Sequence, residues 1–289
     1  MSKVTFKIPA TSANLGLGFD SIGVAIDKFL SITAQPADKW QFQFKTEALK
    51  ALPADEENMV AKMANYVATH YGKEMPPLEI EMASEIPLAH GLGSSSSALV
   101  AGIELANHYL GLNLSEREKI TLGTMVEKHP DNIGPCITGG VFVGVYEQEK
   151  LAYYNLSLDD ISLIVSIPSY EIKTEDARAV LPNRYEKQAA VNQNAKNNVM
   201  LLAMANQDYG LMGELMMGDY FHEPYRQKLI AEYNEVKETA LKNGAYATVI
   251  SGAGPTLLTL CPNEKADEIL KNLNQNVPCM HEKVNVYYA

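Results

Sequence analysis

The chain has 289 residues, of which 46% are hydrophobic and 20% are charged, a composition typical of a globular protein rather than a disordered one. Its 35 acidic and 24 basic residues give a formal net charge of −11. This charge argues against a general nucleic-acid binder, which needs a basic face, but it is compatible with a local site for a small anion. At about 150 residues per domain, the length predicts one large domain or two medium ones.

No targeting or membrane segment is expected. The first nine residues alternate polar and apolar side chains instead of forming a signal-peptide core, and no apolar run reaches the ~18 residues of a membrane span. The three cysteines, Cys136, Cys261 and Cys279, are odd in number and lack the spacing of metal ligands. We therefore expect structural free thiols in a cytoplasmic protein without a membrane or nucleic-acid partner.

Strands and helices are both predicted over the first half of the chain. Apolar residues alternate over 4–8, as in a strand, and a polar, glycine-rich turn follows over 9–20. A helix predicted over 58–71 ends before Gly72. Further strands are predicted at 22–34, 40–45, 78–83 and 141–146, and further helices at 98–109 and 115–127.

The second half is predicted to be mostly helical between 174 and 243, with breaks at Pro182, Gly210, Gly218 and Pro224. Strands are predicted at 162–167, 246–250, 256–260 and 283–288, with a helix at 264–273. Two mixed sets of strands and helices predict two α+β halves packed side by side. We expect an N-terminal domain over 1–155 and a C-terminal domain over 156–289.

The most informative segment runs from Pro87 to Ser97. Its glycines allow tight turns and the close approach of an anion, and its four serines open a helix whose first N–H groups are unpaired. Because helix N-termini attract anions, the segment predicts a phosphate-binding loop. The predicted contact residues are Pro87, Leu88, Ala89, His90, Gly91, Leu92, Gly93, Ser94, Ser95, Ser96 and Ser97.

This loop does not match the common nucleotide-binding motifs. No Gly-Lys-Ser/Thr follows, as a Walker A loop requires, and the third glycine of a dinucleotide fingerprint is missing. The His-Arg-Asp signature of protein kinases is absent as well. The sequence therefore indicates a kinase whose nucleotide-binding fold is of another kind.

Three motifs together resemble those of the GHMP kinases, named for galactokinase, homoserine kinase, mevalonate kinase and phosphomevalonate kinase. The motifs are Pro9–Asp20, Pro87–Ser97 and Ile250–Thr256, which stand in the family order and span nearly the whole chain. The resemblance implies an α+β GHMP kinase fold. Its N-terminal half would resemble domain 2 of ribosomal protein S5, and its C-terminal half would be ferredoxin-like.

Within this superfamily the chain is most similar to the homoserine kinases. The similarity rests on the stretches 14–20, 129–132, 174–182 and 222–226. It implies transfer of the γ-phosphoryl group of ATP to the hydroxyl of L-homoserine, which gives O-phospho-L-homoserine and ADP in threonine biosynthesis. ATP and Mg²⁺ are the implied cofactors.

The implied acceptor is a zwitterion, so its site must hold a carboxylate and an ammonium. A planar guanidinium suits a carboxylate because it donates two parallel hydrogen bonds, and Arg178 and Arg226 match the family positions for this role. Asn14 and Asp20 match the family's amino-acid-binding positions. The resemblance also assigns His129 and Asn132 to the substrate site.

Ser94 and Glu127 are the implied Mg²⁺ ligands, because Mg²⁺ prefers oxygen donors. The choice of serine is open by one position, so the neighbouring Ser95 is the alternative to Ser94. Asp131 and Glu127 are the candidate catalytic residues, and Asp131 is either a general base or an orienting group. Asn58 is either a helix cap or a wall of the nucleotide pocket.

Three functions remain open at this stage. A homoserine kinase is favoured over a GHMP kinase for another small alcohol, because mevalonate lacks the amine that Asp20 would bind. A non-catalytic metabolite sensor would be expected to lose residues such as Ser94, Glu127 and Asp131, which this chain keeps. A homodimer is open too, and the segment 209–217 is read either as its interface or as a core helix.

Overall fold

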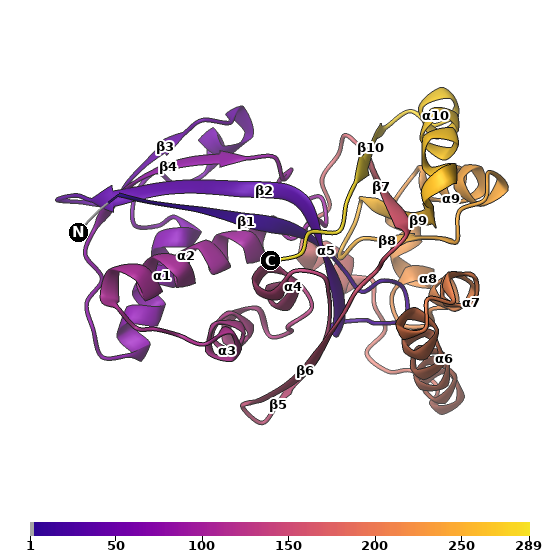
Figure 1. Cartoon of the computed structure of the whole chain (residues 1–289), viewed down its shortest axis with the longest axis horizontal. Helices are drawn as coiled ribbons and strands as arrows, with labels where there is room; N and C mark the ends of the chain where they lie inside the picture. The colour runs from indigo at the N-terminus through magenta and orange to yellow at the C-terminus, as the bar shows by residue number, and fades with distance from the viewer. Residues whose placement is uncertain (1–2) are drawn as a thin grey trace.

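Two β-sheets organise the chain, of which the computed structural model describes residues 3–289. Figure 1 shows the first sheet and its helices on the left and the second sheet with its helices on the right. The predicted pair of α+β halves is confirmed. The change of sheet falls between Leu156 and Ile161, while the domain limits themselves stay a prediction.

The first sheet has six strands arranged around one long, central strand. They are β1 (Val4–Ala13), β2 (Ile22–Pro36), β3 (Gln41–Phe44), β4 (Leu78–Ser84), β5 (Val141–Glu147) and β6 (Lys150–Leu156). β2 pairs antiparallel with β1 over residues 23–34, and it also pairs antiparallel with β4 over 30–36 and with β5 over 22–24, at its two ends. β3 runs parallel to β4 at the sheet edge.

Helices of the first half pack below this sheet in the view of Figure 1. They are α1 (Met59–His70), α2 (Ser94–Leu110), α3 (Glu116–Glu127) and α4 (Ile133–Thr138), with a 3₁₀ turn η1 (Glu47–Ala51). α2 lies against β1 and carries the serines of the predicted phosphate loop at its start. The start of this buried helix is therefore held rigidly beside the end of β1.

The second sheet is antiparallel and has the strand order β10-β7-β9-β8. Its strands are β7 (Ile161–Ile167), β8 (Ala247–Ile250), β9 (Leu257–Pro262) and β10 (Met280–Val284). With helices between β7 and β8 and between β9 and β10, this is the β-α-β-β-α-β order of a ferredoxin-like half. The prediction for the C-terminal half is confirmed.

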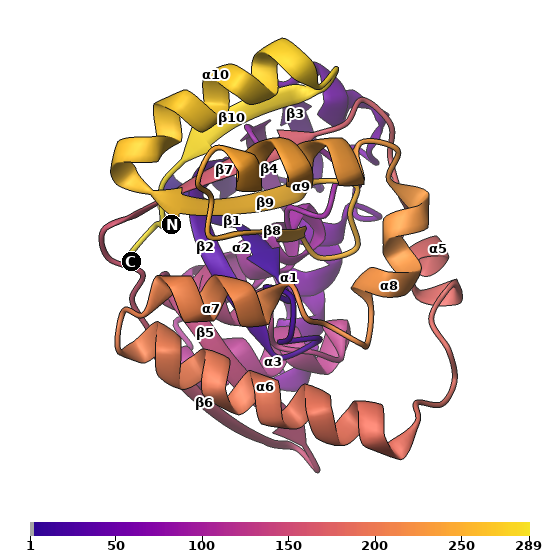
Figure 2. The ribbon, with the colours of Figure 1, turned by 90° about the vertical axis from the view of Figure 1, so that its right-hand side faces the viewer.

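Helices of the second half lie in front of the second sheet and below it in the view of Figure 2. They are α5 (Thr174–Ala179), α6 (Lys187–Ala205), α7 (Tyr209–Met216), α8 (Glu223–Arg226), α9 (Tyr233–Lys242) and α10 (Ala266–Asn276), with 3₁₀ turns η2 (Gln227–Leu229) and η3 (Asn263–Lys265). α7 buries Tyr209, Met212 and Met216, so the interpretation of 209–217 as a core helix is confirmed.

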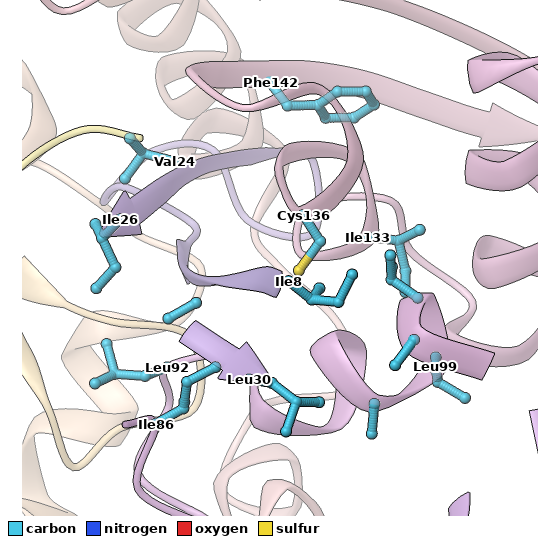
Figure 3. Close-up of a cluster of buried hydrophobic side chains, with 14 of the residues drawn as sticks. Ile8, Val24, Ile26, Leu30, Ile86, Leu92, Leu99, Ile133, Cys136 and Phe142 are labelled. Carbon is cyan, nitrogen blue, oxygen red and sulfur yellow. The ribbon is translucent and has the colours of Figure 1, made fainter. Parts of the chain in front are cut away.

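The two halves share one hydrophobic core instead of being separated by a linker. Alternate residues of β7 face opposite sides: Leu163 and Val165 join the large core, while Ile164 packs with α9 and α10. The large core continues beneath the first sheet, where Figure 3 shows Cys136 of α4 pointing at Ile8 of β1. A shared core fixes the position of one half relative to the other.

Some expectations about local structure were wrong, and some elements were not predicted. β1 runs on to Ala13, although a turn was predicted from residue 9, because Thr11 and Ser12 are fully buried and pair with β2. Gly210 and Pro224 are the second residues of α7 and α8 instead of breaks, and Pro224 suits a first turn because its missing N–H needs no helical partner there. α4 and β6 were not predicted.

The last predicted strand was displaced. β10 occupies 280–284, and the following residues leave the second sheet and cross to the first. There Tyr287 N–H donates to Ala25 O at 3.0 Å, and Gly140 N–H donates to Tyr287 O at 2.7 Å. The apolar alternation through Val286 therefore belongs to a strap between the sheets.

The cysteines are free thiols, as expected. Cys136 and Cys261 are buried, and burial raises the pKa of the Cys136 thiol to about 12. Within residues 3–289 no helix is long and apolar enough to cross a membrane.

Candidate active site

A cavity of about 500 Å³ lies between the two halves. Every residue predicted to bind substrate or metal, or to act in catalysis, lines it: Asn14, Asp20, Ser94, Glu127, His129, Asp131, Asn132, Arg178 and Arg226. The phosphate loop contributes Ala89, Gly91, Gly93, Ser94, Ser95 and Ser96 to the same wall. Residues more than 200 positions apart in sequence, such as Asn14 and Arg226, thus meet in one place.

The phosphate loop leads directly into the N-terminus of α2. Gly93 is the N-cap residue in a left-handed conformation, and no side chain within residues 3–289 caps the helix. Gly91 (φ +76°) passes so close to the second half that a Cβ would lie 2.2 Å from Ser251 O. The first turn of a 17-residue helix therefore presents unpaired N–H groups to the cavity.

Some loop residues brace the site instead of facing it. Leu92 and Ser97 are buried, and the Ser97 hydroxyl donates to Pro9 O at 3.0 Å. The His90 ring nitrogens lie near the carbonyl oxygens of Leu88 and Pro168. The side chains of these residues lie outside the cavity, so any contact they make with an anion would come from the backbone.

Ser96 is the serine that meets the predicted metal carboxylate. Its hydroxyl donates to Glu127 Oε1 at 3.3 Å, across the gap between the start of α2 and the end of α3. Burial raises the pKa of Glu127, and the negative charge of Asp131 acts in the same direction. Ser94 lines the cavity two residues earlier. The geometry thus favours Ser96 over Ser94 as the partner of Glu127.

The loop after α3 brings His129, Asp131 and Asn132 together. His129 Nδ1 lies 2.5 Å from Asp131 Oδ1, and Asn132 accepts a hydrogen bond from the Thr11 hydroxyl at 2.8 Å. Burial opposes a charge on His129, but the hydrogen bond and charge of Asp131 outweigh it and raise the pKa of His129. The buried Asp131 therefore holds the ring of His129 against the cavity.

Two arginines and one carboxylate form the opposite wall. Arg178 of α5 donates to both oxygens of Asp20, at 2.9 and 3.2 Å. Arg226 of α8 donates to Ala177 O and Gly252 O at 3.1 and 2.9 Å. Burial and the neighbouring Arg178 lower the pKa of Arg226 to about 10, so it stays charged at neutral pH.

The loop around Ser251 joins the two predicted sites, in agreement with its family motif. The Ser251 hydroxyl donates to Gly91 O at 2.7 Å, which ties the loop to the phosphate loop. Gly252 O accepts hydrogen bonds from both Asn14 Nδ2 and Arg226 Nη1. One carbonyl group therefore links the acceptor residues of the two halves.

Comparison with known proteins supports the same relationship. The family models for the GHMP kinase N-terminal and C-terminal domains match residues 58–140 and 200–279. Homoserine kinases of Staphylococcus haemolyticus and Staphylococcus aureus (strain bovine RF122 / ET3-1) are 45% and 47% identical over 96% of this chain, covering 92% and 93% of their own lengths. This chain belongs to the homoserine kinase family.

Solved structures agree with this family membership. A homoserine kinase from Cytophaga hutchinsonii has a TM-score of 0.89 at 28% identity, over 100% of this chain and 96% of that one. A mevalonate kinase from Methanococcus jannaschii has a TM-score of 0.75 at 17% identity, over 99% of both chains, which shows a common fold. The fold is thus shared among GHMP kinases, while the sequence similarity is to homoserine kinases.

A second, apolar cavity of about 300 Å³ adjoins the phosphate loop in this homoserine kinase family member. It shares Ala89, Ser94 and Ser95 with the first cavity. Its apolar walls are Leu30, Leu49, Leu52, Pro53, Met59, Met82, Ile86, Leu88 and Ala98. The cavity therefore offers a planar or apolar group a place beside the anion-binding helix start.

Asn58 fulfils the helix-cap interpretation and also lines the apolar cavity. Its side chain accepts from Val60 N at 3.0 Å and donates to Pro53 O at 2.8 Å. Leu49, Leu52 and Met82 were not predicted as lining residues of this cavity, because they carry no signal beyond hydrophobicity and resemble core residues. The sequence analysis also missed Thr11, whose neighbourhood in the first motif was the available signal.

Proposed function

We propose that this chain transfers the γ-phosphoryl group of ATP to the hydroxyl of L-homoserine, giving O-phospho-L-homoserine and ADP in threonine biosynthesis. The observation that carries the proposal is that Arg178, Arg226 and Asp20 face one cavity with the N-terminus of α2. A zwitterionic alcohol needs both signs of charge, and a kinase needs the phosphate site beside them. Similarity to homoserine kinases over 96% of the chain supports this substrate.

The nucleotide would span the two cavities. Its triphosphate suits the unpaired N–H groups at Gly93–Ser96, because a helix N-terminus attracts anions without a full positive charge. The base suits the adjoining apolar cavity, which opens onto Ser94 and Ser95. This arrangement directs the γ-phosphate toward the wall formed by Asp20 and the arginines.

The donor set at Ser96 and Glu127 fits Mg²⁺. Both groups offer oxygen atoms, which lie 3.3 Å apart. A cation beside the buried carboxyl group of Glu127 would favour its ionised form, which burial disfavours. Mg²⁺ bound there would neutralise charge on the phosphate oxygens. We therefore propose Ser96 with Glu127 as the metal ligands, in place of Ser94.

The acceptor would lie against the opposite wall. Arg178 and Arg226 suit its carboxylate, because guanidinium groups pair with carboxylates through directed hydrogen bonds. Asp20 and the side-chain oxygen of Asn14 suit its ammonium. His129 and Asn132 complete the wall between this group and the phosphate loop.

The chemical step is an in-line displacement. The acceptor hydroxyl oxygen forms a bond to the γ-phosphorus as the bond from that phosphorus to the bridging oxygen breaks, so ADP leaves and the hydroxyl proton passes to an oxygen of the transferred phosphoryl group. A loose transition state needs little help from a base. Because Asp131 is buried and engaged with His129, we assign it the orienting role among the two alternatives.

Steady-state assays test the substrate assignment. ADP release with MgATP is compared for L-homoserine, mevalonate, L-threonine and L-serine at equal concentrations. Turnover with L-homoserine alone supports the proposal. Turnover only with mevalonate would move the chain to another GHMP kinase activity, and nucleotide binding without turnover would favour a sensor. A homodimer stays a prediction, for which sedimentation velocity is the measurement.

A further inference from the structure

Phe19 lies directly behind the two arginines of the acceptor wall. Its ring centroid is 5.8 Å from the Arg178 guanidinium carbon and 5.2 Å from that of Arg226. Both distances are within the range of a cation–π contact. Phe19 itself is outside the cavity walls formed by the described residues, so it touches the site through the arginines.

Two guanidinium groups so close together repel one another, and Arg178 is one of the causes that lower the pKa of Arg226. Asp20 offsets part of this repulsion, because its carboxylate pairs with Arg178 and its charge also favours the charged form of Arg226. The negative face of an aromatic ring attracts both cations while adding no net charge. The ring therefore favours a position of Arg226 beside Arg178, and Arg178 itself is paired with Asp20 until an acceptor binds.

The ring of Phe19 is itself fixed from behind. It stacks on His222 with a centroid distance of 5.3 Å and an interplanar angle of 21°. His222 is fully buried, and its Nε2 donates to Gly16 O at 2.8 Å, in the same loop as Phe19. His222 N–H in turn donates to Asp219 at 2.8 Å. The ring is thus clamped between the arginines and a buried polar network.

The loop is held at a second point by Gln193, whose Nε2 donates to Leu17 O at 3.0 Å and to Asp219 at 2.7 Å. Asp219 also accepts from the backbone N–H of Glu223, at the start of the helix that carries Arg226. The buried carboxylate of Asp219 therefore supports both the loop that carries Phe19 and the helix that carries Arg226.

We propose that Phe19 is a positioning residue that keeps Arg178 and Arg226 together and thereby sets the preference of the site for an acceptor with a free carboxylate. The inference rests on the proposed function, since it concerns how the homoserine site is built. Removing the ring should let the two guanidinium groups separate. The kcat/KM for an acceptor with a carboxylate should then fall more than the kcat/KM for an acceptor without one.

The test compares kcat/KM for L-homoserine and for its neutral carboxamide, in the full-length chain with MgATP. In Phe19→Leu, which keeps an apolar side chain but removes the ring, we expect the preference for L-homoserine to fall by about tenfold, mostly through KM. Phe19→Tyr keeps the ring face and should restore the preference. Phe29→Leu is the matched control, because Phe29 also has a lysine over its ring, at 6.0 Å, but lies away from the cavity.

The outcomes separate the two ideas. If the wild-type chain turns over L-homoserine and Phe19→Leu keeps the wild-type preference, the positioning role of Phe19 is wrong and the proposed function stands. An equal loss for both acceptors would indicate a merely structural role and would also overturn the inference. No wild-type turnover with L-homoserine would overturn the proposed function, and this inference with it. If thermal unfolding shows that Phe19→Leu is not folded, Phe19→Met gives the same comparison.

Discussion

Arg178 and Asp20 form a bidentate ion pair that joins the loop after β1 to helix α5. The pair lies at the wall of the acceptor cavity, and both side chains are about one-third exposed, at 39% and 33%. A zwitterion carries one partner for each of them. Binding of the acceptor would therefore replace an interaction within the protein by two interactions with the ligand, which limits the net cost of separating the charges.

The bidentate geometry predicts a loss in Arg178→Lys. A lysine keeps the charge but cannot donate two parallel hydrogen bonds to one carboxylate. Since the pair is partly exposed, we expect KM for L-homoserine to rise roughly tenfold, with KM for ATP much less affected. Arg184→Lys, at an exposed arginine outside both cavities, is the control. Equal effects of the two substitutions would contradict the assignment.

The contact between Ser96 and Glu127 predicts which serine matters for the metal. Ser96→Ala should raise the Mg²⁺ concentration needed for half-maximal activity by on the order of tenfold, because one of the two proposed metal ligands is lost. Ser94→Ala should have a smaller effect, as Ser94 has no such contact with Glu127. Titration of Mg²⁺ at saturating ATP measures both. The reverse order of effects would favour Ser94 as the ligand.

The close approach of the first loop to α7 predicts a stability effect. Gly16 has φ +73°, and a Cβ there would lie 2.1 Å from Met216 O, which is backbone and cannot move aside. Gly72 has a similar φ of +63° but an open surrounding, with no atom of the described chain within 4 Å of a Cβ.

Substitution of these two glycines separates strain from collision. Gly72→Ala should reduce the free energy of unfolding by roughly 1–2 kcal/mol, the cost of a left-handed conformation. Gly16→Ala should reduce it by about 3 kcal/mol or more, since the collision is added. Urea denaturation gives both values, and similar losses at the two sites would show that the contact with Met216 is unimportant.

Glu223 predicts a pH dependence of stability. Its carboxylate is buried and accepts hydrogen bonds from Ile250 N at 2.6 Å and from the Tyr233 hydroxyl at 2.8 Å. Burial raises the pKa of Glu223, although His222 and Lys237 act against the increase. The folded chain then holds this proton more tightly than the unfolded chain does. The contribution of Glu223 to the free energy of unfolding therefore falls as the pH rises from about 4.3 through the raised pKa.

Glu223→Gln has the same shape and does not ionise, so it lacks this loss. Relative to wild type, the variant should become more stable as the pH rises above about 4.3, the ordinary pKa of glutamate, and through the raised pKa of Glu223. Urea denaturation of both proteins at several pH values isolates the difference, because all other groups titrate in both. A relative loss on raising the pH would show that the carboxylate is better stabilised in the folded state than burial suggests.

Local sequence patterns predicted the regular parts of this fold well. The helix predicted over 58–71 is α1, and the strand predicted at 78–83 is β4, because both follow one hydrophobic period along the chain. Elements decided by distant contacts were missed. Thr11 and Ser12 are polar, and only their pairing with Ala25 and Val24 of β2 makes them strand residues.

The candidate site divides in the same way. Residues with distinctive chemistry in a motif, such as Asp20, Glu127 and Arg178, were named from the sequence and meet in one cavity. The apolar cavity was not predicted, because Leu49 or Met82 can serve a core equally well. The choice of Ser96 over Ser94 depends on which face of α2 meets α3, and that is a property of packing rather than of local sequence.

The strap that follows β10 has a consequence for biosynthesis. Ala25 and Gly140 of the first sheet find backbone partners in Tyr287, which is translated after the strands of both sheets. During translation the N-terminal half emerges from the ribosome long before Tyr287 does. Until then, the backbone groups of Ala25 and Gly140 that pair with Tyr287 lack this partner. A nascent chain stopped after β10 would contain every residue of the cavity wall. It would still lack the backbone hydrogen bonds of Tyr287 that connect the end of the second sheet to the first.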